Sequence, residues 1–450
     1  MHTLAQLQSG ELSGITRLQI SDNLTEFPAE IFTLADSLEI LDLSNNQLSA
    51  LPDNLADLVN LKILFCSNNL FTEVPTVLAN CPKLEMIGFK SNQITTLAEN
   101  TLPLNTRWLI LTDNQLTKLP DSMGDLKQLQ KCMLAGNQLT EIPKSIQHCT
   151  NLQLLRLSAN QLTHLPDELL SLPKLSWLAF SGNPFCQTIT KPSNSSNTSN
   201  KIETVCMNDI DFHELLGEGA SGLIHRAKWS TNYAQPKRAK GQIVEKNIAV
   251  KLFKGEVTSD GYPKDELAVC LKIGQHQNIV NTLAVLEDDN QSGMVMNLIP
   301  KKFFNLGEPP TLQSCTRDTF KEEFSLPATS VLNLLIQVAD SMEHIHQQGF
   351  CHGDLYAHNI LINKNDSVLL GDFGAASCFK DLPKKQQKLV TQLEVRAFAN
   401  LIEDLLTITQ RSAMGSYLSN TFKDFVDYCR EEDDLTFTEI KAELIELKEI

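Results

Sequence analysis

Residues 1–186 repeat one pattern of apolar and polar positions. An Asn recurs at steps of 23, 23, 23, 22, 23, 23 and 23 residues, at Asn23, Asn46, Asn69, Asn92, Asn114, Asn137, Asn160 and Asn183. Leucines keep a fixed phase with each Asn, as in the copy that contains Leu38, Leu41, Leu43, Asn46, Leu48, Leu51 and Pro52. Each copy predicts a short strand with inward leucines followed by a turn and a looser segment. Such copies bury their apolar faces only by stacking on their neighbours.

This spacing resembles the leucine-rich repeat signature, and the Leu-Pro ending resembles its intracellular class. The resemblance implies an α/β solenoid of horseshoe shape over residues 1–186, with about eight repeats. The recurring Asn is expected to bond buried backbone groups inside the stack, which is a structural role. We expect residues 1–14 to cap the stack. We expect irregular geometry in the fourth copy, where Ala98 replaces the usual Pro.

The outward strand positions of such an array form its concave face. Here they include an apolar stripe that we predict to be exposed: Phe65, Trp108, Ile110 and Met133. Exposed aromatic and Met side chains are typical of protein-binding surfaces. The stripe therefore predicts a protein partner, which could be a substrate, a regulator or the second half of this chain. The alternative is that neighbouring strands half-cover these positions, as in any such array.

A polar stretch separates the repeats from the rest of the chain. Residues 187–201 read QTITKPSNSSNTSNK, with no periodicity and almost no apolar content. This composition predicts a flexible linker over 187–205, followed by a second domain over 206–450.

A glycine-rich motif opens the second domain, with Leu216 before it and Ile224 after it. Its glycines are Gly217, Gly219 and Gly222. This motif alone fits a dinucleotide-binding fold and a kinase loop about equally. A dinucleotide-binding fold would continue into a helix, whereas residues 223–229 have the character of a strand. Residues 247–253 then form an apolar strand pattern that contains Lys251, and pairing with phosphates would explain a lysine there.

Two further motifs follow at fixed spacing. The first is HGDLYAHN at 352–359, which contains Asp354 and Asn359, and the second is GDFG at 371–374, which contains Asp372. Together, the motifs resemble the eukaryotic-type protein kinase family from about Ile210 to near the C-terminus. The resemblance implies a bilobal α+β protein kinase-like domain that binds ATP and Mg²⁺.

The resemblance also implies roles for individual residues. The nucleotide-binding set is Leu216, Gly217, Gly219, Gly222, Ile224, Ala249, Lys251, Glu266, Met296, Asn297, Ile299 and Leu361. Lys251 would bind phosphates, held by Glu266, with Asp265 as the other candidate. Asp354 would accept the proton of the substrate hydroxyl, with Lys251 and Asn359 completing the catalytic set. Asn359 and Asp372 would hold Mg²⁺.

Several positions depart from the family pattern. Gly353 replaces the usual Arg before the catalytic Asp, and Tyr356 replaces a usual Lys. The segment from Gly374 to Glu394 is short and lacks the Ala-Pro-Glu motif, and Glu394 stands where an Asp is usual. These departures predict a reduced platform for an extended peptide substrate.

Composition narrows the remaining possibilities. The chain has 38 basic and 54 acidic residues, a net charge of −16, and both halves are acidic, so a nucleic-acid partner is not expected. We expect no membrane span, because no apolar stretch approaches the roughly 18 residues that one needs. The 11 cysteines are scattered and odd in number. With no visible signal peptide, they favour reduced thiols in a cytoplasmic protein.

Two functions from different classes remain open at this stage. One is an ATP-dependent protein kinase of the serine/threonine type, whose repeats bind a protein. The alternative is a nucleotide-binding pseudokinase scaffold, favoured by Gly353, Tyr356 and the short segment. A kinase that acts on a small molecule is a third hypothesis.

Overall fold

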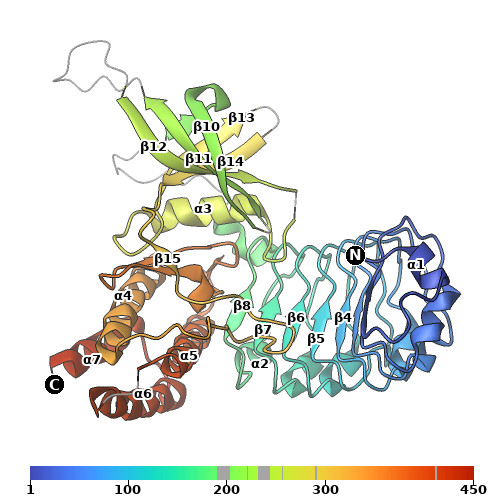
Figure 1. The fold of residues 1–450 in the computed structure, drawn as a ribbon. Coiled ribbons are helices and arrows are strands. Elements are labelled where there is room, and N and C mark those ends of the chain that lie inside the picture. Colours follow the sequence, from blue (N-terminus) through green and yellow to red (C-terminus); the bar gives the residue numbers. More distant parts are fainter. Residues whose placement is uncertain are drawn as a thin grey trace. The chain divides into compact units, whose positions relative to one another are not determined.

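The computed structural model describes residues 1–189, 203–219, 221–231, 244–255, 257–288, 291–410 and 413–449. The chain divides into two compact units. Met1–Phe185 with Ser259–Gly261 form the first, and Cys186–Thr258 with Tyr262–Ile450 form the second. Figure 1 shows a stack of parallel strands in the first unit and a twisted sheet with several helices in the second.

The first unit is built on one parallel sheet. Its eight strands follow sequence order: β1 (Arg17–Gln19), β2 (Ile40–Asp42), β3 (Ile63–Phe65), β4 (Met86–Gly88), β5 (Trp108–Ile110), β6 (Lys131–Met133), β7 (Leu154–Arg156) and β8 (Trp177–Ala179). The central residue of each strand is buried, and these residues pair in register, as Leu41 does with Leu64. The inward leucines of the repeat pattern therefore form the core of the stack.

Short helices precede β1, connect most of the strands and follow β8. They are α1 (Leu4–Gln8), η1 (Ala29–Leu34), η2 (Leu55–Asp57), η3 (Thr76–Asn80), η4 (Asp121–Asp125), η5 (Lys144–His148), α2 (Asp167–Leu170) and η6 (Pro184–Ile189). The η elements are 3₁₀ helices. Within residues 1–189, the connection from β4 to β5 contains no helix. This is the fourth copy, where the missing residue and Ala98 predict irregular geometry.

The N-terminal residues cover the first edge of the sheet. Thr3 caps α1 through a reciprocal pair of hydrogen bonds with Gln6. The backbone N–H of His2 donates to the carbonyl of Gln19 in β1, and Leu7 is buried. Residues 1–14 thus have the contacts expected of a cap.

The recurring Asn residues form a ladder inside the stack. Asn137 is a representative: its Oδ1 accepts the N–H of Leu116, and its Nδ2 donates to the carbonyls of Leu111 and Leu134. These bonds satisfy buried backbone groups of the preceding copy and of the copy that contains Asn137. Asn23 departs from the ladder, since it is exposed and has a φ of 53°.

The second unit begins with a six-stranded sheet in the order β10-β11-β12-β14-β13-β9. The strands are β9 (Glu203–Val205), β10 (Ile210–Glu218), β11 (Gly222–Thr231), β12 (Val244–Phe253), β13 (Thr282–Asp288) and β14 (Gln291–Asn297). Neighbouring strands are antiparallel except for β9, which pairs in parallel with β13. The helix α3 (Pro263–Ile273) connects β12 to β13.

The predicted linker ends earlier than expected. Residues 190–202 lie outside the described residues, but Glu203–Val205 form the edge strand β9. Val205 is buried with Leu286 and Val295 in the core of the sheet. Burial of that one apolar side chain gives a physical reason for a strand in a stretch of polar composition.

The rest of the second unit is mainly helical. Its long helices are α4 (Ala328–Gln347), α5 (Lys384–Thr407), α6 (Ala413–Glu431) and α7 (Phe437–Glu449). Its smaller elements are η7 (Met207–Asp209), β15 (Phe304–Asn305), β16 (Phe350–Cys351), η8 (Ala357–Asn359), β17 (Ile360–Ile362), β18 (Val368–Leu370) and β19 (Ser377–Cys378). In α4, the buried residues Leu335, Val338, Met342 and Ile345 recur at helical spacing, which explains why this segment is a helix. None of the helices in the described part of the chain combines the length and the hydropathy needed to span a bilayer.

Candidate active site

The glycine-rich segment turns from β10 into β11. The N–H of Gly219 donates to the carbonyl of Gly222 at 2.9 Å, which closes the turn. A Cβ on Gly222 would lie 2.3 Å from the carbonyl oxygen of Leu252, so this position requires glycine. Around Gly217 and Gly219 the corresponding space is open. This open space leaves room for a ligand beside the turn, as a phosphate-binding loop requires.

Lys251 lies in the middle of β12, opposite Ile224 and Met294. Its Nζ is 2.5 Å from Oε1 of Glu266 on α3, and both side chains are at least nine-tenths buried. Burial opposes the charged lysine, but Glu266 and the nearby Asp372 outweigh it and raise the pKa of Lys251. The lysine is therefore a fixed positive charge in this site.

Asp265, the other candidate partner, does not bind Lys251. Successive residues of a helix point about 100° apart, so only one of Asp265 and Glu266 can face β12. Oδ2 of Asp265 is buried and has no hydrogen-bond partner among the described residues. Burial raises the pKa of Asp265 to about 6.

The residues expected around the nucleotide base come from two sheets. Ala249 on β12 pairs directly with Met296 on β14, so these two side chains share a face of the sheet with Lys251. Asn297 ends β14 and is exposed. Ile299 follows in the connection and is partly buried, whereas Leu216, before the glycine turn, is exposed. Leu361 lies on β17, in the separate three-stranded sheet β15-β17-β18.

The loop before η8 brings Asp354 and Asn359 together. Nδ2 of Asn359 donates to the carbonyl oxygen and to Oδ2 of Asp354, both at 2.9 Å. The N–H of Asp354 donates to Nδ1 of His352, so the other nitrogen, Nε2, carries the hydrogen and donates to the carbonyl of Gly371 at 3.0 Å. Gly371 in turn donates its N–H to the carbonyl of Asn359. These bonds tie residues 352–359, the candidate catalytic loop (called the catalytic loop below), to the segment that carries Asp372.

Asp372 is exposed and has a φ of 54°, an unusual backbone conformation for a residue other than glycine. Such strain is concentrated at functional sites. The next residue, Phe373, is buried, and its ring lies 5.0 Å from that of His352. Packing of Phe373 therefore holds the strained Asp372 in place.

Glu394 on α5 anchors the start of the catalytic loop. Its two oxygens accept the backbone N–H groups of His352 at 2.6 Å and of Gly353 at 2.9 Å. Burial opposes its charge, but contacts with His346 and the amide of His352 outweigh burial and lower the pKa of Glu394. Gly353 has a φ of 73°, a conformation that favours glycine and gives a reason for its presence where the family usually has Arg.

Tyr356 does not extend into solvent. It is 3% exposed, and its ring lies 5.1 Å from the ring of His358. His358 is paired in turn with the buried Asp318 at 2.7 Å. Burial opposes the charged imidazole, but Asp318 and the nearby Asp354 outweigh it and raise the pKa of His358.

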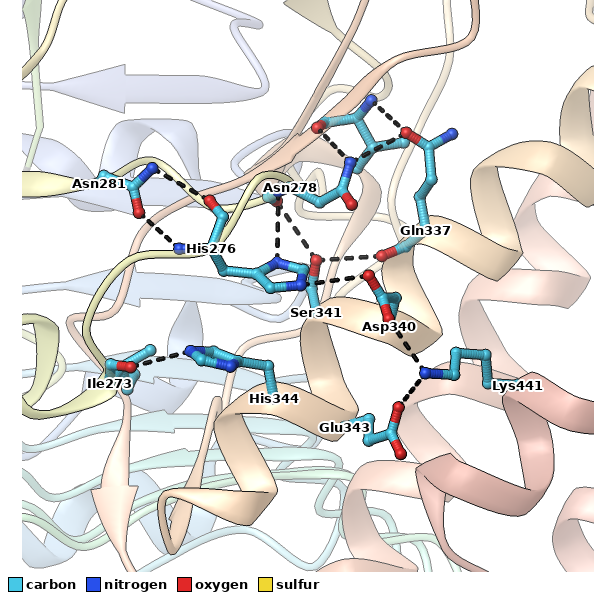
Figure 2. A network of polar contacts seen from close by, with 11 residues as sticks. Ile273, His276, Asn278, Asn281, Gln337, Asp340, Ser341, Glu343, His344 and Lys441 are labelled. Carbon is cyan, nitrogen blue, oxygen red and sulfur yellow. Dashed lines mark hydrogen bonds and ion pairs between the residues drawn. The ribbon is translucent and has the colours of Figure 1, made fainter.

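A polar network fixes the segment after α3 to helix α4 (Figure 2). Nε2 of His276 lies 3.2 Å from Asp340, and the ring of His276 stacks on that of His344. Asn278 donates to Gln337 on α4 and to the carbonyl of Val368. The end of α3 is therefore held by the helical part of the unit, which limits how far Glu266 can move.

The apolar stripe predicted on the concave face is less exposed than expected. Phe65, Trp108, Ile110 and Met133 are all partly buried. Phe65 lies over Gly88 of the next strand, whose missing side chain leaves room for its ring. Nζ of Lys131 lies 4.2 Å from the ring centre of Trp108 and covers one face of the indole. Cross-strand packing thus removes part of the stripe from solvent.

Three residues near this loop could not be found by motif. They are His358, its partner Asp318, and Arg317, which pairs with Asp404 of α5. Arg317 and Asp318 lie in a polar loop, and no spacing or periodicity distinguishes them from other charged surface residues. His358 stands inside the catalytic-loop motif, but that motif gives it no role. Only the fold brings these residues to the site.

Family comparisons agree with both halves of this structure. A family model described as protein tyrosine and serine/threonine kinase matches residues 210–410. Leucine-rich repeat models match residues 104–162 and 128–185. A further model, for the leucine-rich repeats of leucine-rich repeat and WD repeat-containing protein 1, matches residues 1–104.

Individual relatives are distant. A probable serine/threonine-protein kinase of Clostridium acetobutylicum is 26% identical over 39% of this chain and 23% of its own length. Cyclin-dependent kinase 11.1 of Caenorhabditis elegans is 28% identical over 43% of this chain and 24% of its own. The tyrosine-protein kinase receptor old-1 of the same species is 27% identical over 46% and 42%. The chain thus spans less than half the length of each of these relatives.

Part of the chain also resembles solved structures, among them that of a leucine-rich repeat protein. A leucine-rich repeat protein of Leptospira interrogans is 33% identical over 40% of this chain and 46% of its own, with a TM-score of 0.37. The assignment of the chain to protein families rests on the family models and does not use this structure. The chain consists of leucine-rich repeats followed by a domain of the protein tyrosine and serine/threonine kinase family.

Proposed function

We propose that this protein is an ATP-dependent protein kinase that transfers the γ-phosphate of Mg-ATP to a serine or threonine hydroxyl of a protein. The observation that carries the proposal is the buried pair of Lys251 and Glu266 beside Asp372. A buried lysine is costly unless it is paired, and phosphate oxygens would complete its coordination. The kinase relatives and the family model support the same reaction.

The nucleotide would lie against β10, β11 and β12. Open backbone at Gly217 and Gly219 suits the phosphates, while Ile224, Ala249 and Met296 offer apolar surface to the base. Lys251 would contact the phosphates without leaving Glu266, because a lysine ammonium has three donors. This arrangement positions the phosphoryl group by electrostatics, which is how most phosphoryl transfer is catalysed.

The residues present fit a magnesium ion. The oxygens of Asn359 and Asp372 are the hard ligands that Mg²⁺ prefers, and few protein ligands suffice because phosphates complete its shell. Among the described residues there is no cluster of three or more His, Cys, Asp or Glu that could hold a metal alone, in keeping with a site that the nucleotide completes. When bound, the ion would neutralise charge that develops on the phosphate oxygens.

Asp354 would orient the substrate hydroxyl and accept its proton. Asn359 holds one carboxylate oxygen of Asp354, which limits the rotation of that side chain. The remaining oxygen can face a hydroxyl group. The name of the Clostridium acetobutylicum relative supports serine or threonine as the acceptor residue, whereas old-1 is named a tyrosine-protein kinase receptor.

The leucine-rich repeats would recruit the protein substrate or a regulator. Phe65, Trp108, Ile110 and Met133 keep part of their apolar surface on one face of the sheet. A half-covered apolar face of this kind suits a protein partner.

A nucleotide-binding pseudokinase is the second candidate, and Tyr356 favours it. Its ring is buried against His358, so the position does not supply the cation that the family's lysine would place near the phosphate. Transfer of label from γ-labelled ATP by the wild-type protein, absent in Asp354→Ala, supports the kinase. Background label in both, together with a thermal shift by Mg-ATP that Lys251→Ala loses, supports the pseudokinase and overturns the kinase proposal.

A further inference from the structure

The end of the catalytic loop depends on the position of His358. This residue precedes Asn359 in the short helix η8. The amide of Asn359 reaches both the carbonyl oxygen and Oδ2 of Asp354 at 2.9 Å. A small displacement of His358 would move Asn359 and break both contacts. Whatever fixes His358 therefore also fixes the geometry of Asp354 and Asn359.

Asp318 holds His358 at two points. Its Oδ2 accepts the backbone N–H of His358 at 2.8 Å, and its Oδ1 lies 2.7 Å from Nδ1 of the ring. The Asp318 side chain is completely buried, at 0% exposure. A buried carboxylate is tolerated only when its oxygens are hydrogen-bonded, and here one residue satisfies both. The contact fixes the backbone of His358 and the orientation of its ring together.

Asp318 is fixed by its own neighbours. The guanidinium of Arg317 donates to Oδ1 of Asp404 at 2.7 Å and to the carbonyl of Asn400 at 2.8 Å. On the other side, Thr319 exchanges two backbone hydrogen bonds with Glu308, at 2.8 and 3.0 Å. A charged side chain between two anchored residues is held in place before any ligand binds.

The helix α5 thus supports the catalytic loop at both ends. Glu394 of α5 holds the start of the loop at His352, and Asp404 of α5 holds the end through Arg317 and Asp318. Glu394 and Asp404 lie ten residues apart on one helix, so a single rigid element sets the distance between the two supports.

We propose that Asp318 is a positioning residue for phosphoryl transfer, which it serves by clamping His358 and so holding Asn359 against Asp354. This inference rests on the proposed function. Asp318 touches neither nucleotide nor substrate hydroxyl and acts only through His358. With the clamp in place, the loop has support that does not require a phosphorylated activation segment, for which Gly353 offers no arginine side chain.

Steady-state kinetics of Asp318→Ala and Asp318→Asn test the proposal. A misplacement of about 1 Å in a catalytic group can lower a rate by about 100-fold. Asp318→Ala should therefore lower kcat on that order, while the affinity for ATP without Mg²⁺ stays close to the wild-type value because Lys251 and the glycine turn are untouched. Asp318→Asn should retain an intermediate rate, since its amide oxygen can still accept the N–H of His358.

Glu439→Ala is the matched control. Glu439 is an acid at the start of α7 that accepts the N–H and the hydroxyl of Thr436, in the same unit and outside both the catalytic loop and the network of Figure 2. It should lose stability and keep the wild-type kcat. If Asp318→Ala keeps the same kcat as this control at equal folded fraction, the positioning role is overturned and Asp318 is only structural. If Asp318→Ala does not fold, Asp318→Asn and His358→Ala carry the same comparison.

A binding readout separates this inference from the proposed function. The gain in ATP affinity on adding Mg²⁺ should be lost in Asp318→Ala, because Asn359 is displaced, while affinity without Mg²⁺ should persist. If the wild type transfers no phosphate, the proposed function fails, yet loss of the Mg²⁺-dependent gain in the variant still supports the clamp. An unchanged gain in the variant overturns the clamp whether or not the wild type is active.

Discussion

Glu394 accepts the backbone N–H of His352 at 2.6 Å, so a carboxylate on α5 carries the first residue of the catalytic loop. The second oxygen of Glu394 accepts the N–H of Gly353 at 2.9 Å. Both hydrogen bonds are charge-assisted and buried, which makes them stronger than hydrogen bonds between neutral groups. Glu394 thus anchors the loop from the position where the family usually has Asp.

Glu394→Gln should lower the free energy of unfolding by about 2–4 kcal/mol at neutral pH, because one oxygen acceptor becomes a donor that faces a buried N–H. Urea denaturation at pH 7.5 measures this loss. The surface variant Glu446→Gln on α7 is the control and should stay within about 0.5 kcal/mol of wild type. A stability of Glu394→Gln equal to that control would contradict the anchoring role.

The same carboxylate predicts a dependence on acid. The pKa of Glu394 is lowered in the folded protein, so folding favours its ionised form. Its contribution is present above the unfolded pKa and is lost as pH falls through the folded pKa. The melting temperature of the wild type should therefore fall more steeply below about pH 4 than that of Glu394→Gln. If the melting temperatures of the two proteins fall equally with pH, the ionised form of Glu394 does not stabilise the fold.

The contribution of Asp265 to folding stability should change with pH in the opposite direction. Burial raises its pKa to about 6, so the folded state binds its proton more tightly than the unfolded state, and stability falls as pH rises from about 4 to 6. Asp265→Asn removes this cost and should stabilise the protein by up to about 3 kcal/mol at pH 7.5. Below about pH 4 the gain should vanish. Thermal unfolding at both pH values measures it, and a destabilised variant at pH 7.5 would be inconsistent with an unpaired buried carboxylate.

Removal of one rung of the Asn ladder should destabilise the repeats. Asn137→Ala leaves the N–H of Leu116 and two carbonyl oxygens without their partner. The expected loss is about 2–4 kcal/mol, measured by denaturation of the full chain. The neighbouring Gln138→Ala alters an exposed residue and should change stability by less than about 0.5 kcal/mol. Equal losses of stability in the two variants would contradict the structural role of the ladder.

The concave surface should decide which proteins are bound. Phe65→Ala with Trp108→Ala should abolish capture of the protein that the wild type binds most strongly, identified by mass spectrometry. Leu104→Ala with Val59→Ala is the matched control, since both residues are exposed, apolar and outside the strands. Loss of the same protein in both double variants would place the binding surface elsewhere.

The sequence predicts most of the fold because its signals are periodic or strictly spaced. Leucine phase predicts the stack, and motif order predicts a kinase domain that the family model confirms. The kinase resemblance implies the pairing of Lys251 with Glu266 and leaves Asp265 as the other candidate, and the helix geometry of α3 explains why Asp265 turns away. Local spacing therefore captures residues that lie on one element or on neighbouring strands.

Other features depend on contacts that no local pattern encodes. β9 forms because Val205 fits the core of the sheet beside its pairing strand β13, which lies far along the chain. The stripe of Phe65 and Trp108 is half-covered because Gly88 and Lys131 belong to neighbouring repeats. Asp318 contacts His358 although 40 residues separate them along the chain, and Asp318 lies in a loop without periodicity. Such long-range polar pairs are visible only once the chain is folded.

The most direct test of the central claim is the kcat for phosphate transfer from saturating Mg-ATP, compared between wild type and Asp354→Asn, with ATP affinity measured on the same samples. The proposed mechanism predicts a fall in kcat of at least about 100-fold with little change in ATP affinity, because Asp354 acts on the hydroxyl and not on the nucleotide. Equal rates in the two proteins, or no transfer above background in either, would contradict it.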